Sequence, residues 1–197
     1  MGAALVALAA AFGVPLAGGG FWTTTLLYGG TILGIPVACA LLDPAGDPPG
    51  LRGRADFRLA LLLALATLPA FVIVVRLLGS APPPLPTLVD FGAIASLQMF
   101  AVALPEEVFF RGFVQRRLAA WRAGVGGGAR SFLGGTVGVE LPATALLFAL
   151  FHLPARGIAG LATFFPGLLF GWAYARSGNV WAGALFHAAC NLAARWA

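Results

Sequence analysis

Apolar segments long enough to cross a lipid bilayer recur along this chain and limit what it can fold into. A membrane-spanning helix needs roughly 20 predominantly apolar residues. Residues 21–42 have that length without any charge, and Phe57–Leu78 carries charge only at Arg58 and Arg76, near its two ends. Hydrophobic residues make up 60% of the sequence and charged residues 10%, whereas a soluble domain has about 25% charged residues. The sequence therefore predicts an all-α fold, a polytopic transmembrane bundle of about six to eight helices.

The other predicted helices are less regular. Residues 2–17 could be the core of a signal peptide, but no Lys or Arg precedes them, so we favour a short first membrane helix. Residues 88–121 form a long helical stretch that Pro105 is expected to kink or restart. The last predicted helices are residues 141–153, 158–174 and 180–194. The predicted loops, rich in Gly, Pro or small polar residues, are residues 43–56, 82–86, 124–128 and 177–179.

Every basic residue of this chain is an arginine, and the net charge is +5. Basic residues of membrane proteins mark cytoplasmic loops and helix ends, so this charge indicates no nucleic-acid partner. The arginines that predict the cytoplasmic loops are Arg52, Arg54, Arg58, Arg116, Arg117, Arg122, Arg130 and Arg176. The arginine-only, Ala- and Gly-rich composition is typical of a bacterial protein. We therefore expect one integral domain, residues 1–197, spanning the inner (plasma) membrane of a bacterium several times.

Two adjacent glutamates, Glu106 and Glu107, lie in an apolar stretch. A charge in hydrocarbon costs several kcal/mol, so intramembrane carboxylates are functional candidates by default. Glu107 and Arg111 are four residues apart with the glutamate first, which favours an ion pair. The spacing gives Glu106 no such partner, and burial disfavours its charged form, which suits a general base. In the alternative interpretation, both glutamates lie at a helix end near the membrane surface and pair with arginines.

The two histidines of the chain, His152 and His187, both lie in apolar segments. Phe148 is one turn before His152 on the same helix face. His187 and Asn191 are also one turn apart, and two hydrogen-bond donors on one face suit the stabilisation of an oxyanion. The alternative is that these polar side chains only link helices to one another, as Asn and His do in membrane proteins.

The candidate residues are predicted to lie at similar depths in the membrane. At ~1.5 Å per helical residue, Glu106, His152 and His187 lie roughly 17, 17 and 12 Å from the cytoplasmic ends of their helices. A base and oxyanion donors are what a peptide hydrolase without a nucleophilic side chain requires. No Gly-x-Ser-x-Gly motif indicates a serine nucleophile. Both Cys39 and Cys190 lie in apolar segments and are expected to be buried, unreactive residues.

Three short motifs occur in order in the second half of the chain. They are Glu106-Glu107-x-x-x-Arg111, Phe148-x-x-x-His152 and His187-x-x-x-Asn191. In residue type, order and spacing they resemble the motifs of the CAAX protease and bacteriocin-processing family of intramembrane glutamic endopeptidases. The Ras-converting CAAX endopeptidase belongs to this family. The resemblance covers residues 104–192, which we take as the catalytic core.

This resemblance implies a protease that needs no nucleophilic side chain. By analogy, Glu106 and His152 activate the attacking water, and His187 and Asn191 stabilise the oxyanion. The analogy gives supporting roles to Glu107, Arg111 and Phe148. It also implies a mechanism without a cofactor, and a zinc-dependent variant is the alternative, although no His-Glu-x-x-His motif is present.

The expected substrate is a membrane-associated protein or peptide that is cut near one terminus, at a leader or at a C-terminal sorting signal. We expect the active site to open towards the cytoplasmic side. One rival interpretation is a non-catalytic scaffold or bacteriocin-immunity factor of the same fold. Another is a proton-coupled transporter, although the polar residues gather at one depth instead of forming a path across the membrane.

Overall fold

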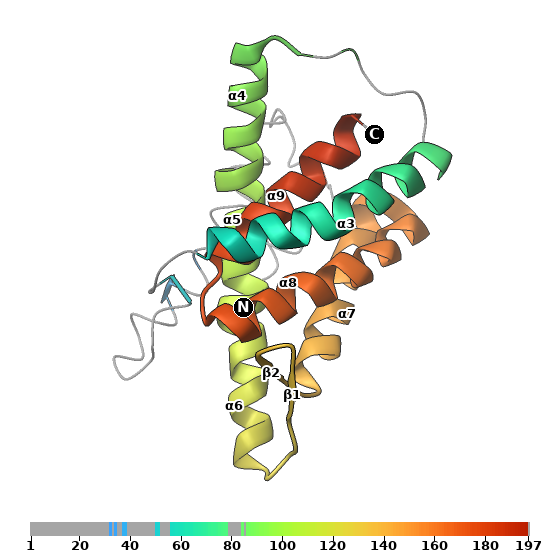
Figure 1. The fold of residues 1–197 in the computed structure, drawn as a ribbon. Coiled ribbons are helices and arrows are strands. Elements are labelled where there is room, and N and C mark those ends of the chain that lie inside the picture. The colour runs from blue at the N-terminus through green and yellow to red at the C-terminus, as the bar shows by residue number, and fades with distance from the viewer. Residues whose placement is uncertain are drawn as a thin grey trace.

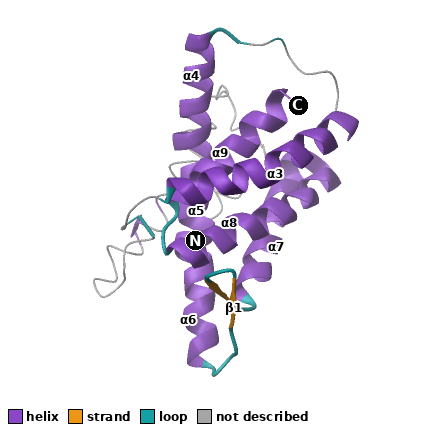
Figure 2. Cartoon of the chain, in the orientation of Figure 1, coloured by secondary structure: helices purple, strands orange, loops and turns teal. Residues whose placement is uncertain are grey.

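The computed structural model describes residues 56–78 and 86–196, together with the isolated positions 32, 34, 37, 38, 50, 51 and 84. Apart from these isolated positions, the predicted helices at residues 2–17 and 21–42, the loop that follows them up to residue 55 and residues 82–85 of the linker lie outside the described residues, as does Cys39. The described part is almost entirely helical (Figure 2). Three of its helices are long and apolar enough to cross a membrane. The predicted all-α transmembrane fold is confirmed.

Helix α3, Phe57–Leu78, begins where the sequence placed it. The side chain of Asp56 caps this helix, because its Oδ1 accepts a hydrogen bond of 2.9 Å from the backbone N–H of Leu59. One face of α3 packs through Leu59 and Leu63 on the core, and much of its remaining apolar surface is exposed. An exposed apolar face is expected for a helix that borders lipid.

A single helix of 37 residues, Leu88–Gly124, carries both glutamates. The side chain of Thr87 caps its start by accepting from the backbone N–H of Asp90. The segments of this helix, in order, are α4 (Leu88–Leu97), the π-helical η1 (Gln98–Ala103), α5 (Leu104–Glu107), the π-helical η2 (Val108–Gln115) and α6 (Arg116–Gly124). In Figure 1 they form one continuous rod.

The helix does not restart at Pro105, one of the two effects that we expected there, because it continues through this residue. Proline has no N–H to donate and disrupts the ordinary i→i−4 pattern. The π-helical turn η1 accommodates this loss: the N–H of Leu104 bonds to the carbonyl of Met99, five residues earlier. Such π turns inside α-helices occur frequently at functional sites, and here both glutamates lie between two of them.

A short β-hairpin follows α6 and was not predicted. Strands β1 (Arg130–Phe132) and β2 (Gly135–Val137) pair antiparallel, and Leu133 and Gly134 turn between them with positive φ angles. The indole N–H of Trp172 donates a 3.0 Å hydrogen bond to the carbonyl of Phe132, which fixes the hairpin to the following helices. Three-residue strands are too short to give a clear alternating pattern in the sequence.

The last helices are α7 (Glu140–Arg156), the 3₁₀ helix η3 (Gly157–Thr163), α8 (Phe164–Ser177) and α9 (Trp181–Trp196). Their bounds agree with the predicted ones to within a few residues, except that residues 157–163 are 3₁₀ instead of α-helical. The predicted turn at 177–179 is present, with Gly178 in the left-handed conformation.

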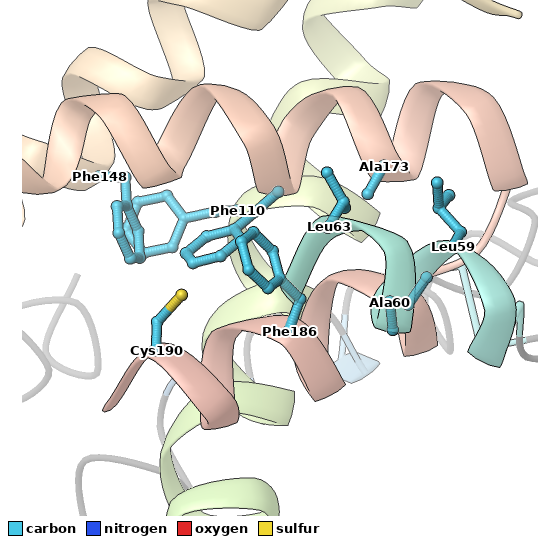
Figure 3. Close-up of a cluster of buried hydrophobic side chains, with 10 residues drawn as sticks. Leu59, Ala60, Leu63, Phe110, Phe148, Ala173, Phe186 and Cys190 are labelled. Carbon is cyan, nitrogen blue, oxygen red and sulfur yellow. The ribbon is translucent and has the colours of Figure 1, made fainter. Parts of the chain in front are cut away.

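Aromatic side chains from the long helix and from helices α7 to α9 meet in the centre of the fold. Phe110, Phe148, Phe170 and Phe186 are each at most 3% exposed, and Figure 3 shows three of them with Cys190 and the residues of α3. Neighbouring rings meet edge to face, with centroids 5.2 Å apart for Phe110 and Phe148 and 5.4 Å apart for Phe170 and Phe186. This cluster fixes the positions of the helices that carry the three motifs.

Candidate active site

Glu107 lies completely buried at the meeting point of the long helix and α9. Its Oε1 is 3.2 Å from Nη1 of Arg111, so the predicted ion pair is confirmed. The same oxygen is 3.0 Å from Nδ1 of His187. The α9 backbone approaches closely because residue 183 is a glycine, where a Cβ would lie 3.0 Å from Oε2 of Glu107. The sequence did not predict that Glu107 also binds His187.

Arg111 and Gln115, one turn apart on the long helix, bind two carbonyls that are also one turn apart on α8. Nη2 of Arg111 donates to the carbonyl of Gly167 at 3.1 Å, and Nε2 of Gln115 donates to that of Gly171 at 2.9 Å. The guanidinium of Arg111 also lies 4.5 Å from the ring centroid of Phe148, a cation–π contact. These bonds fix both the rotation and the height of the glutamate-bearing helix against α8.

His187 is buried and lies between the two glutamates. Its ring stacks on Phe170, with centroids 4.6 Å apart and an interplanar angle of 14°. Its Nε2 lies 3.8 Å from Oε2 of Glu106. Glu107, held as a carboxylate by Arg111, only accepts hydrogen bonds, so Nδ1 of His187 carries a hydrogen and donates it to Glu107. Nε2 is therefore the ring nitrogen that faces Glu106.

Counted over Glu106, Glu107 and Arg111 alone, the charges of this buried cluster balance when it holds one extra proton. Two ionised carboxylates, Glu106 and Glu107, oppose one guanidinium, Arg111, and all three side chains are nearly inaccessible to water. An uncompensated buried charge is costly. One proton, on Nε2 of His187 or on Glu106, makes the cluster neutral. When His187 holds the proton, Glu106 is ionised and Nε2 is a hydrogen-bond donor.

His152 is half-buried near the end of α7, and its orientation is set by a backbone hydrogen bond. Its Nδ1 lies 2.8 Å from the carbonyl oxygen of Phe148. A carbonyl oxygen only accepts, so Nδ1 donates and Nε2 keeps a lone pair. The Phe148 ring contacts both histidines, with centroid distances of 4.5 Å to His152 and 5.6 Å to His187. Phe148 thus holds the two imidazoles on the same side of the core.

Asn191 is held by a residue that the sequence analysis did not single out. Its Nδ2 donates a 3.1 Å hydrogen bond to Oε1 of Gln98, in the π-helical turn η1. An amide nitrogen carries two N–H groups, so a second donor is left for a ligand. The structure therefore brings Glu106, His187 and Asn191 together through contacts between the long helix and α9.

A cavity of about 360 Å³ lies against these residues. It is lined by the imidazoles of His152 and His187, the amide of Asn191 and mostly apolar side chains. Apolar neighbours from three further elements line it too, and they include Phe71, Val74, Val75, Ala162, Pro166 and Phe170. Glu106 is not among the described lining residues, but its Oε2 lies 3.8 Å from Nε2 of His187, which lines the cavity. Helices α3, α8 and η3 form the walls together with α7 and α9, and none of the described lining residues comes from the long helix.

The lining residues of this cavity lie away from the arginine-rich α6. On α3 they are Phe71, Val74 and Val75, all in the C-terminal half of the helix, and on α7 they extend from Phe148 to Arg156 in the last turn. Arg116, Arg117 and Arg122, which predicted the cytoplasmic side, lie on α6, and in Figure 1 α6 and the hairpin form the end opposite to the C-terminus. The side of the membrane that the site faces stays a prediction.

No metal-binding cluster is found within residues 56–78 and 86–196. No three His, Cys, Asp or Glu side chains of these ranges are grouped so that they could hold a metal ion. Nδ1 of each histidine is already hydrogen-bonded, to Phe148 and Glu107 respectively. The described donors thus do not fit a zinc site, and a metal-free mechanism stays a prediction.

Sequence reasoning missed Gln98, Gln115 and Arg156, three polar residues near the site. Gln115 could have been found, because it is one turn beyond Arg111 and polar in an apolar stretch. Gly167 and Gly171 likewise have the small-xxx-small spacing of close helix contacts. Gln98 is bonded to Asn191, 93 residues away, and no local pattern indicates such a pair. Arg156 lines the cavity, but in the sequence it is only a basic residue in the last turn of a helix.

Apolar membrane-spanning helices and a buried cluster of Glu, His and Arg define this chain as an integral membrane protein with acid–base groups in its core. A comparison with protein families matches residues 89–193, more than half of the chain, to the Rce1-like type II CAAX prenyl endopeptidases. The chain belongs to this family, and membership indicates a protease. The curated proteins contain no match, and neither do the solved structures.

Proposed function

We propose that this protease hydrolyses a peptide bond near a membrane-associated terminus of its substrate, and that water activated by Glu106 and His152 is the nucleophile. The observation that carries the proposal is the position of His187, between two buried glutamates and against the cavity. This arrangement supports the proposal, because Glu106 and His187 lie on neighbouring helices with Oε2 and Nε2 3.8 Å apart.

In the proposed reaction, water attacks the scissile carbonyl carbon and loses a proton to Glu106. Nε2 of His152, which keeps a lone pair because Nδ1 donates to the Phe148 carbonyl, orients the water by accepting its other hydrogen. The proton on Glu106 then passes to the leaving amine nitrogen as the C–N bond breaks. The products are one carboxylic acid and one amine, and Glu106 is regenerated.

The oxyanion of the tetrahedral intermediate is stabilised by Nε2–H of His187 and by the second N–H of Asn191. The charge balance of the buried cluster supports this assignment, because the protonation state that ionises Glu106 also makes His187 a donor. Glu107, Arg111 and Phe148 position the two histidines. Removing one oxyanion donor typically lowers kcat by about 10²–10³-fold.

The mainly apolar lining of the cavity supports a lipid-modified or otherwise apolar peptide as substrate. Family membership adds a specific class, because CAAX prenyl endopeptidases are named for C-terminal sequences in which a prenylated cysteine precedes the last residues. Leader peptides and C-terminal sorting signals are further substrates of suitable chemistry.

We place the protein in the bacterial plasma membrane on the composition of its sequence.

The direct test compares wild type with Glu106→Gln in a membrane proteome, by mass spectrometry of processed protein termini. We expect a set of termini that the variant lacks, because loss of a general base lowers turnover by about 10²–10⁴-fold. Identical termini from a normally folded variant would support a non-catalytic scaffold instead. Purified protein and a prenylated CAAX-type peptide give the same comparison in a defined system.

A chelator tests the metal-free mechanism in the purified system. Prolonged treatment with 1,10-phenanthroline or EDTA is expected to leave the cleavage rate unchanged, because the proposed reaction uses only side-chain groups. Activity that is lost on chelation and restored by zinc would establish the zinc-dependent alternative. Metal analysis of the active, purified protein provides an independent measurement.

A further inference from the structure

Arg156 is the only Arg, Lys, Asp or Glu among the described residues that line the cavity. It lies in the last turn of α7 and its side chain is exposed. Within the described part of the chain, its side chain takes part in no hydrogen bond or ion pair. A basic residue at the end of a helix often only complements the helix dipole. Arg156 differs because its side chain also borders the cavity that contains the two histidines.

We propose that Arg156 is the binding site for the free C-terminal carboxylate of the substrate. The proposal rests on the proposed function and names the part of the substrate that this side of the cavity recognises. A guanidinium binds a carboxylate with two parallel hydrogen bonds, which gives both affinity and direction. No acidic side chain among the described lining residues competes for it.

The spacing along α7 fits a cut close to the C-terminus. His152 and Arg156 are four residues apart, so they lie on one helix face about 6 Å apart along the axis. Two or three extended residues span about 7–10 Å, and the length of the arginine side chain adds to its reach. A carboxylate bound at Arg156 therefore places the second or third peptide bond from the end near His152. The apolar walls suit the aliphatic residues between these points.

The experiment uses two prenylated CAAX-type peptides that differ only in a C-terminal carboxylate or carboxamide. Binding is measured on full-length Glu106→Gln protein in detergent by fluorescence anisotropy, so that turnover does not interfere. We expect the carboxylate peptide to bind about tenfold or more tightly, which is the range for a charge-assisted pair. Arg156→Gln in this background should weaken the binding of the carboxylate peptide alone, to the affinity of the carboxamide peptide.

Arg117→Gln is the matched control, because it removes the same charge from an exposed site away from the cavity. It should keep the preference for the carboxylate, and Arg156→Lys should retain part of it. Equal binding of the two peptides, or a preference that survives Arg156→Gln, overturns the proposal. The alternative ligand of Arg156 is a lipid phosphate. Repeating the measurement in vesicles with and without anionic lipid tests this alternative. A role in binding lipid phosphate gives lipid dependence and no carboxylate preference.

Cleavage by wild type separates this inference from the proposed function. Cleavage of both peptides at equal kcat/KM refutes the role of Arg156 and leaves the protease activity established. A carboxylate preference in binding without any cleavage supports the role of Arg156 and counts against the proposed reaction on this substrate class.

Discussion

At the scale of single residues, Arg111 connects three parts of the site. It pairs with Glu107, binds the backbone of α8 and lies against the ring of Phe148. Removal of one partner from a buried ion pair leaves an uncompensated charge and costs about 3–5 kcal/mol. Arg111 is therefore expected to stabilise the folded protein whether or not it contacts the substrate.

We expect Arg111→Ala to lower the yield of folded protein and its apparent Tm in detergent by several degrees, and to abolish activity. Arg111→Lys should rescue little, because an ammonium cannot reproduce the planar contacts of the guanidinium. Arg117→Ala, at an exposed site, is the control and should unfold like wild type. An unchanged unfolding temperature for Arg111→Ala would contradict the ion pair as a stabilising interaction.

Only the local part of this residue network could be predicted. The Glu107–Arg111 pair follows from helical spacing, and both histidines stand out because they are polar in apolar segments. The bond between His187 and Glu107 joins residues 80 positions apart, so it depends on how α9 packs against the long helix. The roles that the family resemblance gives to Glu106, His152 and Asn191 stay predictions until the variants are measured.

At the scale of elements, close contact between α9 and the long helix depends on Gly183. A Cβ at this position would lie 3.0 Å from Oε2 of Glu107, which is closer than side chains normally approach. The glutamate cannot move away easily, because Arg111 and His187 hold its other oxygen. A methyl group at residue 183 must therefore displace either α9 or the ion pair.

We expect Gly183→Ala to lower both the apparent Tm and the cleavage rate, the latter by about tenfold or more because small misplacement of catalytic groups is costly. Gly124→Ala is the matched control, since a Cβ at this helical glycine meets nothing within 4 Å. It should be neutral or stabilising by up to ~1 kcal/mol, from helix propensity alone. Thermal unfolding and peptide cleavage on the same preparations test both expectations.

Hydropathy and loop residues were enough to predict most helix positions, because each membrane helix must satisfy its own backbone in lipid. The π-helical turns and the hairpin were beyond such reasoning. Both π-helical turns flank the Leu104–Glu107 segment and depend on hydrogen bonds that residue types alone do not specify. The hairpin is held by Trp172, from a helix 40 residues later.

At the scale of the whole molecule, the ends of the described helices place the cavity and the hairpin on opposite sides. Ala159 lines the cavity, whereas Gly128 lies in the loop that leads to β1. The helix that joins them in sequence, α7, runs between these two regions (Figure 1). The positive-inside rule predicts that the arginine-rich end with α6 and the hairpin faces the cytoplasm. A cavity that opens towards the cytoplasm predicts the opposite orientation.

We expect Ala159→Cys and Gly128→Cys, each in a chain with Cys39 and Cys190 replaced by alanine, to react with membrane-impermeant maleimide from opposite sides. Labelling is compared in intact cells and in inverted membrane vesicles. Gly128→Cys should label from the cytoplasmic side if the arginine clusters set the orientation. Labelling of both positions from one side would contradict the arrangement of α7 and η3 across the membrane.

The length of the helix Leu88–Gly124 has a mechanical consequence. At ~1.5 Å per residue, its 37 residues extend about 55 Å, whereas the hydrocarbon core of a bilayer is about 30 Å thick. The rod that carries Glu106 therefore extends beyond the hydrocarbon core, and no loop interrupts it between its projecting end and this carboxylate. A torque or a docked protein at the projecting end is therefore expected to act on the candidate site without having to enter the membrane.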